Sequence, residues 1–98
     1  MPEPTLTPSA LREALKQIPG WKRRGAVIHR TFEFADFPAA LRFVNAVGKA
    51  AEKAQHHPDI DIRWNRVTLL LTTHDSGGLT ALDFALAARA STLAETLH

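Results

Sequence analysis

Two adjacent histidines, His56 and His57, stand directly before Pro58 in the stretch EKAQHHPD. Imidazoles exchange protons near neutral pH, so this pair suits general acid–base catalysis or metal binding. Glu52 lies four residues before His56, which would place both side chains on one face at the end of a helix. A helix end and a nearby carboxylate both favour a protonated imidazole, so we expect His56 to be a proton donor. The proline favours an extended backbone at His57, whose side chain should leave in another direction.

A third histidine, His74, and a later carboxylate, Asp83, extend this set of candidates. His74 ends the apolar run VTLLLTTH, directly before a glycine-rich loop, where a rigid sheet can hold a site. Asp83 stands three residues after Thr80, near the start of a predicted final helix. Structural interpretations compete with these, because histidines often end helices and Thr80 with Asp83 resembles a capping box. The third histidine favours a catalytic interpretation of the set.

Metal binding and nucleophilic catalysis are the competing chemistries. Histidine and aspartate are suitable ligands for Zn²⁺ or Fe²⁺, but neither His-x-His nor His-Glu-x-x-His spacing occurs. Ser76 lies near His74 and Asp75, without the pattern of a nucleophile elbow. Cysteine is absent, which excludes disulfides, thiolate ligands and a cysteine nucleophile. We therefore predict metal-free acid–base chemistry.

The composition predicts one soluble globular domain over residues 1–98, with residues 1–6 frayed: 45% of the residues are hydrophobic and 22% are charged. No apolar run approaches the about 20 residues of a membrane span, and the start MPEPTLTPSA lacks the features of a signal peptide. We therefore expect a cytoplasmic protein. The pI is near 9.5, but the net charge is only +2 and Lys22-Arg23-Arg24 is the one basic run of three. Nucleic-acid binding is not indicated.

The first half of the chain predicts a helix, a hairpin and a second helix. Thr7-Pro8 is typical of a helix start and Pro19-Gly20 of its end. A turn at Arg24-Gly25 should separate strands over residues 21–24 and 26–35. Asp36 can cap the second helix, which Pro58 ends. The apolar stripe predicted to lie on the sheet comprises Phe37, Leu41, Val44, Gly48 and Ala51.

The second half predicts another hairpin and a last helix. Ile60, Ile62 and Trp64 alternate with charged residues, which is typical of a half-buried strand. Asn65-Arg66 should turn the chain into the apolar run, which we expect to be a central strand. Thr80 can cap the last helix. Its predicted buried stripe comprises Leu82, Leu86, Ala90, Leu93 and Leu97.

The predicted order of elements is therefore α-β-β-α-β-β-α. Strands joined by tight turns form an antiparallel sheet, and the helices must cover one of its faces. We predict a two-layer α+β fold, with a four-stranded antiparallel sheet and three helices on one face.

The candidate residues together match a longer pattern. It consists of a charged residue, three residues, His-His-Pro, five residues, an aromatic, nine residues, His, and at least eight residues before Asp. Its positions here are Glu52, His56-His57-Pro58, Trp64, His74 and Asp83. In this pattern, in the flanking AEKAQHHPDI and TTHDSGGLTALD, and in its element order, the chain resembles the pterin-4a-carbinolamine dehydratases.

The resemblance implies dehydration of 4a-hydroxytetrahydrobiopterin, or a related pterin, to quinonoid dihydropterin. This reaction recycles the cofactor of aromatic amino acid hydroxylases and requires no metal or cofactor of its own. By carry-over, His56 and His74 are general acids and His57 binds the pterin.

The remaining motif residues would serve binding. Pro58 and Asp83 would shape the pocket, Glu52 would act as an orienting residue, and Trp64 would form a packing wall. The chain departs from the family at two positions. Family members often have Asp or Asn where Gln55 stands and an aromatic residue where Ile60 stands, so the affinity for the pterin and the preferred pterin could differ.

The competing function is that of a non-catalytic binding module, because the family includes a dimerisation cofactor of a transcription factor and relatives linked to assembly of a carboxylase. Helix surfaces would then carry the function. Retention of all three histidines favours the enzyme.

The chain is also expected to form a homodimer, or a homotetramer through helix faces. The strand over residues 26–35 is long, lacks proline and carries apolar residues on one face, so we expect edge-to-edge pairing of two sheets. The last helix is also apolar around more of its surface than one sheet contact requires.

Overall fold

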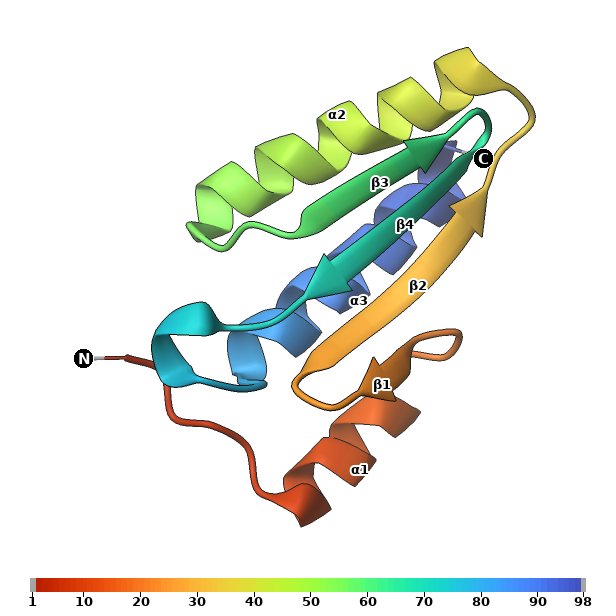
Figure 1. The fold of residues 1–98 in the computed structure, drawn as a ribbon. Coiled ribbons are helices and arrows are strands. Elements are labelled where there is room, and N and C mark those ends of the chain that lie inside the picture. The colour runs from red at the N-terminus through yellow and green to blue at the C-terminus, as the bar shows by residue number, and fades with distance from the viewer. Residues whose placement is uncertain (1, 98) are drawn as a thin grey trace.

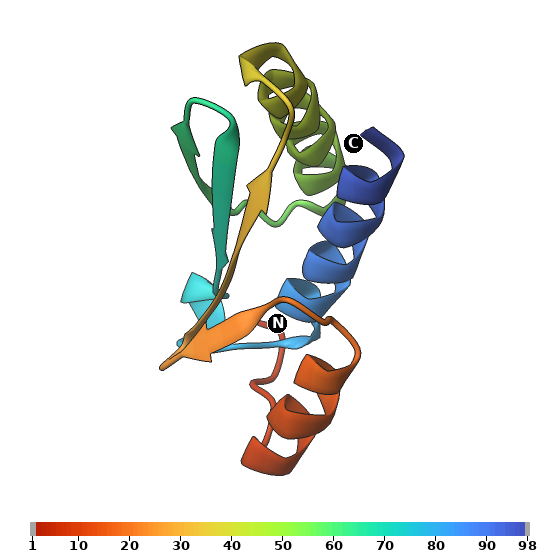
Figure 2. The same cartoon turned by 90° about the vertical axis from the view of Figure 1, so that its right-hand side faces the viewer.

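A four-stranded antiparallel sheet, in strand order β1-β2-β4-β3, forms one layer of the computed structural model, which describes residues 2–97 (Figure 1). All three helices lie on the same side of this sheet (Figure 2). The elements are α1 (Pro8–Lys16), β1 (Lys22–Arg24), β2 (Val27–Glu33), α2 (Phe37–Ala54), β3 (Asp59–Arg63), β4 (Arg66–Leu71), a 3₁₀ turn (His74–Ser76) and α3 (Ala81–Leu97). The predicted α+β class and element order are confirmed.

Strand β2 lies inside the sheet, between β1 and β4, so the assembly prediction was wrong to treat all of it as an edge. Strand β4 pairs with residues 28–33 of β2, whereas the short β1 pairs only with residues 27–29. The backbone over residues 30–33 therefore has no strand on its outer side among the described residues. Only this half of β2 offers an edge to another chain.

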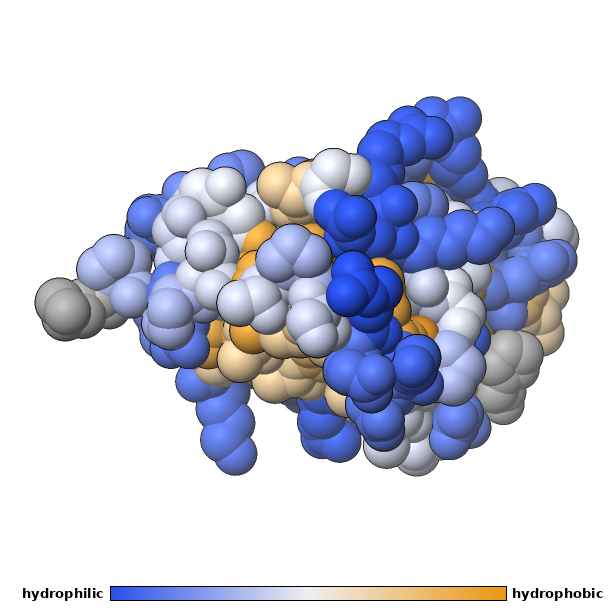
Figure 3. Space-filling model, turned by 90° about the horizontal axis from the view of Figure 1, so that it is seen from below, coloured by the Kyte–Doolittle hydropathy of each residue, from blue (hydrophilic) through white to orange (hydrophobic). Residues whose placement is uncertain are grey.

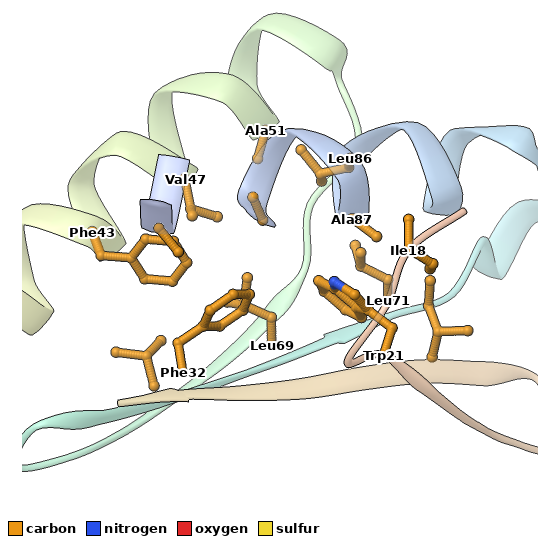
Figure 4. Close-up of a cluster of buried hydrophobic side chains, with 14 of the residues drawn as sticks. Ile18, Trp21, Phe32, Phe43, Val47, Ala51, Leu69, Leu71, Leu86 and Ala87 are labelled. Atoms are coloured by element: carbon orange, nitrogen blue, oxygen red, sulfur yellow. The ribbon is translucent and has the colours of Figure 1, made fainter. Parts of the chain in front are cut away.

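The core fills the space between the sheet and helices α2 and α3 (Figure 4). Phe43 of α2 is fully buried, and its ring centroid lies 4.8 Å from that of Phe32 and 4.9 Å from that of Phe34. Trp21 packs edge-on against Phe32 and donates its indole N–H to Ser91 Oγ at 2.9 Å. Alternation along β2 and β4 thus directs large side chains to one face.

The predicted stripe of α2 was wrong at three of its five positions, whereas Ala51 is buried and Val44 is half-buried against the core. Phe37 and Leu41 are 43% and 38% exposed, and Gly48 is exposed as well. The buried residues are Ala39, Ala40, Phe43, Val47 and Ala51. Both series have helical spacing, because α2 is apolar over more than one face. The position of Asp36, which accepts the Ala39 N–H at 2.9 Å, and the path of the chain out of β2 set which face meets the sheet.

The predicted burial of β3 and of the last helix also needs correction. All residues of β3 are exposed, because β3 is an edge strand and the helices pack over the central strands. In α3, Leu86 and Ala90 are buried as predicted, but Leu82, Leu93 and Leu97 are only half-buried. The buried face instead includes Asp83, Phe84, Ala87 and Ala94.

The N-terminal segment runs along the loop that precedes α3. Leu6 donates its N–H to the Leu79 carbonyl at 3.0 Å, and the Ser76 hydroxyl donates to the carbonyl of Glu3. Both Glu3 and Leu6, which the predicted fraying includes, thus have a hydrogen-bond partner in this loop, and Met1 lies outside the described residues. Seen from the side of α1, hydrophobic side chains gather in a small area beside hydrophilic ones (Figure 3).

No helix described for residues 2–97 combines the length and the hydrophobicity that crossing a bilayer requires.

Candidate active site

Three chain segments that carry the candidate residues meet at one end of the sheet. They are the end of α2, the 3₁₀ turn after β4, and the start of α3 (Figure 1). The β3–β4 hairpin is short and antiparallel, so the chain returns along β4 to the end of the sheet that it left at Pro58. The fold therefore brings His56, His74 and Asp83 to the same region.

The end of α2 determines where His56 points. Gln55 adopts the left-handed conformation, with φ 52° and ψ 40°. Its N–H donates to the Glu52 carbonyl at 3.2 Å, and the His56 N–H donates to the Ala51 carbonyl at 3.1 Å. This is the Schellman arrangement, which closes a helix and reverses the chain. His56 is therefore outside the helix, and the prediction that it shares a helix face with Glu52 was wrong.

His56 is buried against Asp83 instead. Its Nε2 lies 2.6 Å from Oδ1 of Asp83, and the two residues are 8% and 0% exposed. A histidine this close to a buried carboxylate has a defined ring orientation, and the carboxylate stabilises the positive charge that the ring carries when it is doubly protonated. The pair can thus hold a proton and deliver it.

Asp83 itself is held by the start of α3. Its Oδ2 accepts the Thr80 N–H at 2.9 Å, while the Thr80 hydroxyl accepts the Leu82 N–H at 3.2 Å. This is the predicted capping arrangement, and it coexists with the pairing of Asp83 and His56. Oδ2 also accepts the Thr73 hydroxyl at 2.8 Å. Thr73 was not predicted from the sequence. Its only signal there is that it directly precedes His74.

His57 and Glu52 form a second, exposed pair. Nε2 of His57 lies 2.9 Å from Oε1 of Glu52, and their side chains are 61% and 70% exposed. The carboxylate of Glu52 therefore orients His57. The sequence had led us to expect that it would act on His56 instead. The two adjacent histidines point apart, as predicted, and have different carboxylate partners.

The remaining candidates lie in different places. His74 begins the 3₁₀ turn and is exposed, three residues after the end of β4, and Pro58 is half-buried beside His57. Trp64 is not in a strand but in the turn after β3, with φ 52° and 67% of its surface exposed. Because a strand rises about 3.3 Å per residue, Trp64 lies about 20 Å along the chain from Pro58. Within one chain the fold does not bring Trp64 to the histidines.

The histidines lie outside a groove between α2 and α3. This groove has a volume of about 600 Å³, and no histidine lines it. Among residues 2–97, no three His, Asp or Glu side chains are placed to hold one metal ion. The His56–Asp83 pair is a geometry that suits proton transfer.

The family's sequence profile, described as Pterin 4 alpha carbinolamine dehydratase, matches residues 4–93. A protein of Acidobacterium capsulatum, "Putative pterin-4-alpha-carbinolamine dehydratase", is 59% identical over 83 residues, which are 85% of this chain and 90% of the relative. The chain belongs to the pterin-4a-carbinolamine dehydratase family. A protein of the same name from Chloroflexus aurantiacus is 58% identical over 85 residues, 87% of this chain and 91% of the relative.

Solved structures show the same dehydratase fold. "Crystal structure of transcriptional coactivator/pterin dehydratase from Brucella Melitensis" superposes with a TM-score of 0.89 at 37% identity, over 92% of this chain and 98% of that chain. A pterin dehydratase-like protein described as a RuBisCO assembly factor in the alpha-carboxysome has a TM-score of 0.63 at 23% identity, over 76% of this chain and 86% of that chain. The second likeness is one of fold alone.

Proposed function

We propose that this chain dehydrates 4a-hydroxytetrahydropterins, with 4a-hydroxytetrahydrobiopterin as the model substrate, to the quinonoid dihydropterin. The observation that carries the proposal is the buried His56–Asp83 pair, with 2.6 Å between Nε2 and Oδ1, inside a chain of this family. A histidine fixed by a carboxylate is the group that such a proton transfer requires.

The reaction itself needs two proton transfers and no electron transfer. The C4a–O bond breaks with its electron pair, and the oxygen takes a proton and leaves as water. The neighbouring ring N–H loses a proton as the C=N bond forms. His56 and His74 are the general acids in this proposal, each serving one face of the pterin, and neither metal nor cofactor is required.

The binding roles rest on the exposed part of the site. His57, oriented by Glu52, contacts the pterin, and Pro58 favours an extended backbone at His57. Asp83 shapes the pocket by fixing His56. Trp64 would form its packing wall only in a site completed by a second copy of the chain, because it lies at the far end of β3.

The purified chain should accelerate the disappearance of chemically generated 4a-hydroxytetrahydrobiopterin above the spontaneous rate. Because the mechanism uses only protein side chains, extensive treatment with a chelator should leave this rate unchanged. The measurement is the ultraviolet absorbance change on dehydration, with and without protein. Loss of activity with the chelator and its return with Zn²⁺ would contradict the metal-free mechanism.

The cellular context follows from the reaction. Recycling of tetrahydropterin serves an aromatic amino acid hydroxylase, so we propose a functional link to such an enzyme in the cytoplasm. Neither nucleic acid nor a membrane is among the proposed partners.

A homodimer is part of the proposal. Residues 30–33 of β2 have an open backbone edge, and Ile60 and Ile62 on the opposite edge strand are 38% and 37% exposed. Pairing of two sheets would cover one of these edges. Light scattering at micromolar concentration should give at least twice the monomer mass of 10.8 kDa. A monomer mass at this concentration would contradict the prediction.

The groove between α2 and α3 favours a second candidate function, that of a binding module. Alanine and leucine side chains form its floor, and Lys49, Lys53 and Arg89 lie along it. The Brucella melitensis protein is described as a transcriptional coactivator/pterin dehydratase, and the protein with 23% identity is described as a RuBisCO assembly factor. Carbinolamine dehydration by the isolated chain above the spontaneous rate would support the enzyme. A chain without this activity would instead support the groove as the functional surface. The same groove would also hold the helix faces of a tetramer.

A further inference from the structure

The hydrogen bonds of Asp83 determine which nitrogen of His56 carries a proton. Its Oδ2 accepts two donors, the Thr80 N–H and the Thr73 hydroxyl. Both contacts are ones in which a carboxylate oxygen accepts, and a carboxylate has no proton to donate. Its Oδ1 must then accept a proton from His56, and Nε2 at 2.6 Å is the nitrogen that donates it.

The two threonine hydroxyls form a chain with one direction. Thr73 Oγ1 lies 2.8 Å from Asp83 Oδ2 and 2.7 Å from Thr80 Oγ1. Since Thr73 gives its single hydroxyl proton to Asp83, the Thr80 hydroxyl must donate to Thr73. Both threonines are buried, at 6% and 0% exposure, so water does not substitute for either contact. Among residues 2–97, Thr73 is thus the one side-chain hydroxyl that donates to Asp83.

The other nitrogen of His56 is free to act. Nδ1 has no hydrogen-bond partner among residues 2–97, and no buried side-chain nitrogen or oxygen of these residues lacks a partner. Nδ1 is therefore reached by solvent, although the residue as a whole is 8% exposed. A substrate would meet this nitrogen.

Thr73 also anchors the turn that carries His74. Its backbone exchanges two hydrogen bonds with Gly78, at 3.3 and 3.4 Å, and its carbonyl accepts the Ser76 N–H at 3.1 Å. These contacts close the 3₁₀ turn directly behind Thr73. One residue thus connects both proposed general acids, His56 through Asp83 and His74 through the backbone.

We propose that Thr73 is a positioning residue, whose hydroxyl orients Asp83 so that His56 is held as the Nε2–H tautomer and exchanges protons with the pterin through Nδ1. The kinetic part of this inference rests on the proposed function. When Nδ1 gives its proton to the departing hydroxyl oxygen, the C4a–O bond breaks and water leaves. His56 returns to the neutral Nε2–H form, Asp83 stays ionised, and the ring N–H passes its proton to a second base as the C=N bond forms.

NMR of the ¹⁵N-labelled protein tests the tautomer without any turnover. Long-range ¹H–¹⁵N spectra distinguish a protonated from an unprotonated imidazole nitrogen, and a His56→Gln sample assigns the signals. We expect neutral His56 in the wild type to be protonated on Nε2. Protonation on Nδ1 with a bare Nε2 would overturn the proposal.

Three variants test the hydroxyl. Thr73→Val removes it at nearly constant volume, Thr73→Ser retains it, and Thr72→Val removes the neighbouring hydroxyl, which donates to the Ala26 carbonyl at 2.6 Å. We expect Thr73→Val to lower kcat about tenfold with little change in KM and to yield a mixture of His56 tautomers. Thr73→Ser and Thr72→Val should stay within about threefold of the wild-type kcat.

The outcomes separate this inference from the proposed function. Unchanged His56 signals and kcat in folded Thr73→Val would overturn the positioning role, and so would a Thr73→Ser variant as impaired as Thr73→Val. If Thr73→Val does not fold, the kcat of Thr73→Ser still tests the positioning role, and the wild-type spectrum still tests the tautomer. A wild-type chain without dehydratase activity would overturn the proposed function, while the spectra would still support or overturn the tautomer.

Discussion

Replacing His56 with glutamine should lower kcat for carbinolamine dehydration by about 10²–10⁴-fold, which is typical of a lost general acid. Glutamine can still donate a hydrogen bond to Asp83, so the buried carboxylate keeps a partner and the variant should fold. It cannot exchange a proton, however. The rate of carbinolamine disappearance at saturating substrate, corrected for the spontaneous reaction, measures the effect, and circular dichroism checks the fold.

The other two histidines provide the comparison. His74→Gln should lower kcat over a similar range, less if His56 compensates. His57→Ala should act mainly on KM, because His57 is exposed and paired with Glu52, away from Asp83. A silent His56→Gln together with a His57→Ala that lowers kcat at unchanged KM would reverse the assigned roles.

Asp83→Ala should cause the largest loss of stability, about 3–5 kcal/mol in the free energy of unfolding. The substitution leaves three buried donors without their acceptor: His56 Nε2, the Thr73 hydroxyl and the Thr80 N–H. A chain of this size is stable by about 5–15 kcal/mol, so the loss is a large part of the total. Urea denaturation of the wild type and the variant measures it.

Asp83→Asn is the matched control, because it keeps the size and one acceptor oxygen. With that oxygen toward Thr73 and Thr80, its NH₂ group faces His56 and favours the opposite tautomer. We therefore expect a much smaller loss of stability than in Asp83→Ala but a large loss of activity, as the same exchange causes in serine protease triads, about 10⁴-fold. Equal destabilisation by alanine and asparagine would show that the carboxylate oxygens are not the stabilising contacts.

Local features of the chain were sufficient to predict the order of the elements. Proline, glycine and capping residues mark helix ends through backbone geometry, and alternation marks strands, so the α-β-β-α-β-β-α order is confirmed. The sequence predicted less well which face of each helix is buried. Helix α2 has two overlapping apolar series at helical spacing. The predicted series was wrong at Phe37, Leu41 and Gly48, because spacing does not determine which face meets a sheet.

The motif determined which residues to consider, but not how they pair. From the sequence, Glu52 was assigned to His56 because the two are four residues apart and the helix was expected to continue. The left-handed Gln55 ends the helix first, which turns His56 inward and leaves Glu52 with His57.

By itself, the sequence determined the element order, the membership of His56, His57, His74 and Asp83 in one motif, and through it the family. Only the tertiary structure decided that His56 pairs with Asp83, 27 residues away, and that Thr73 holds Asp83. It also decided that Trp64 lies apart from the histidines. The physical reason is that propensity and periodicity act between neighbours in the chain, whereas these contacts depend on how the end of α2 and the start of α3 meet at the sheet.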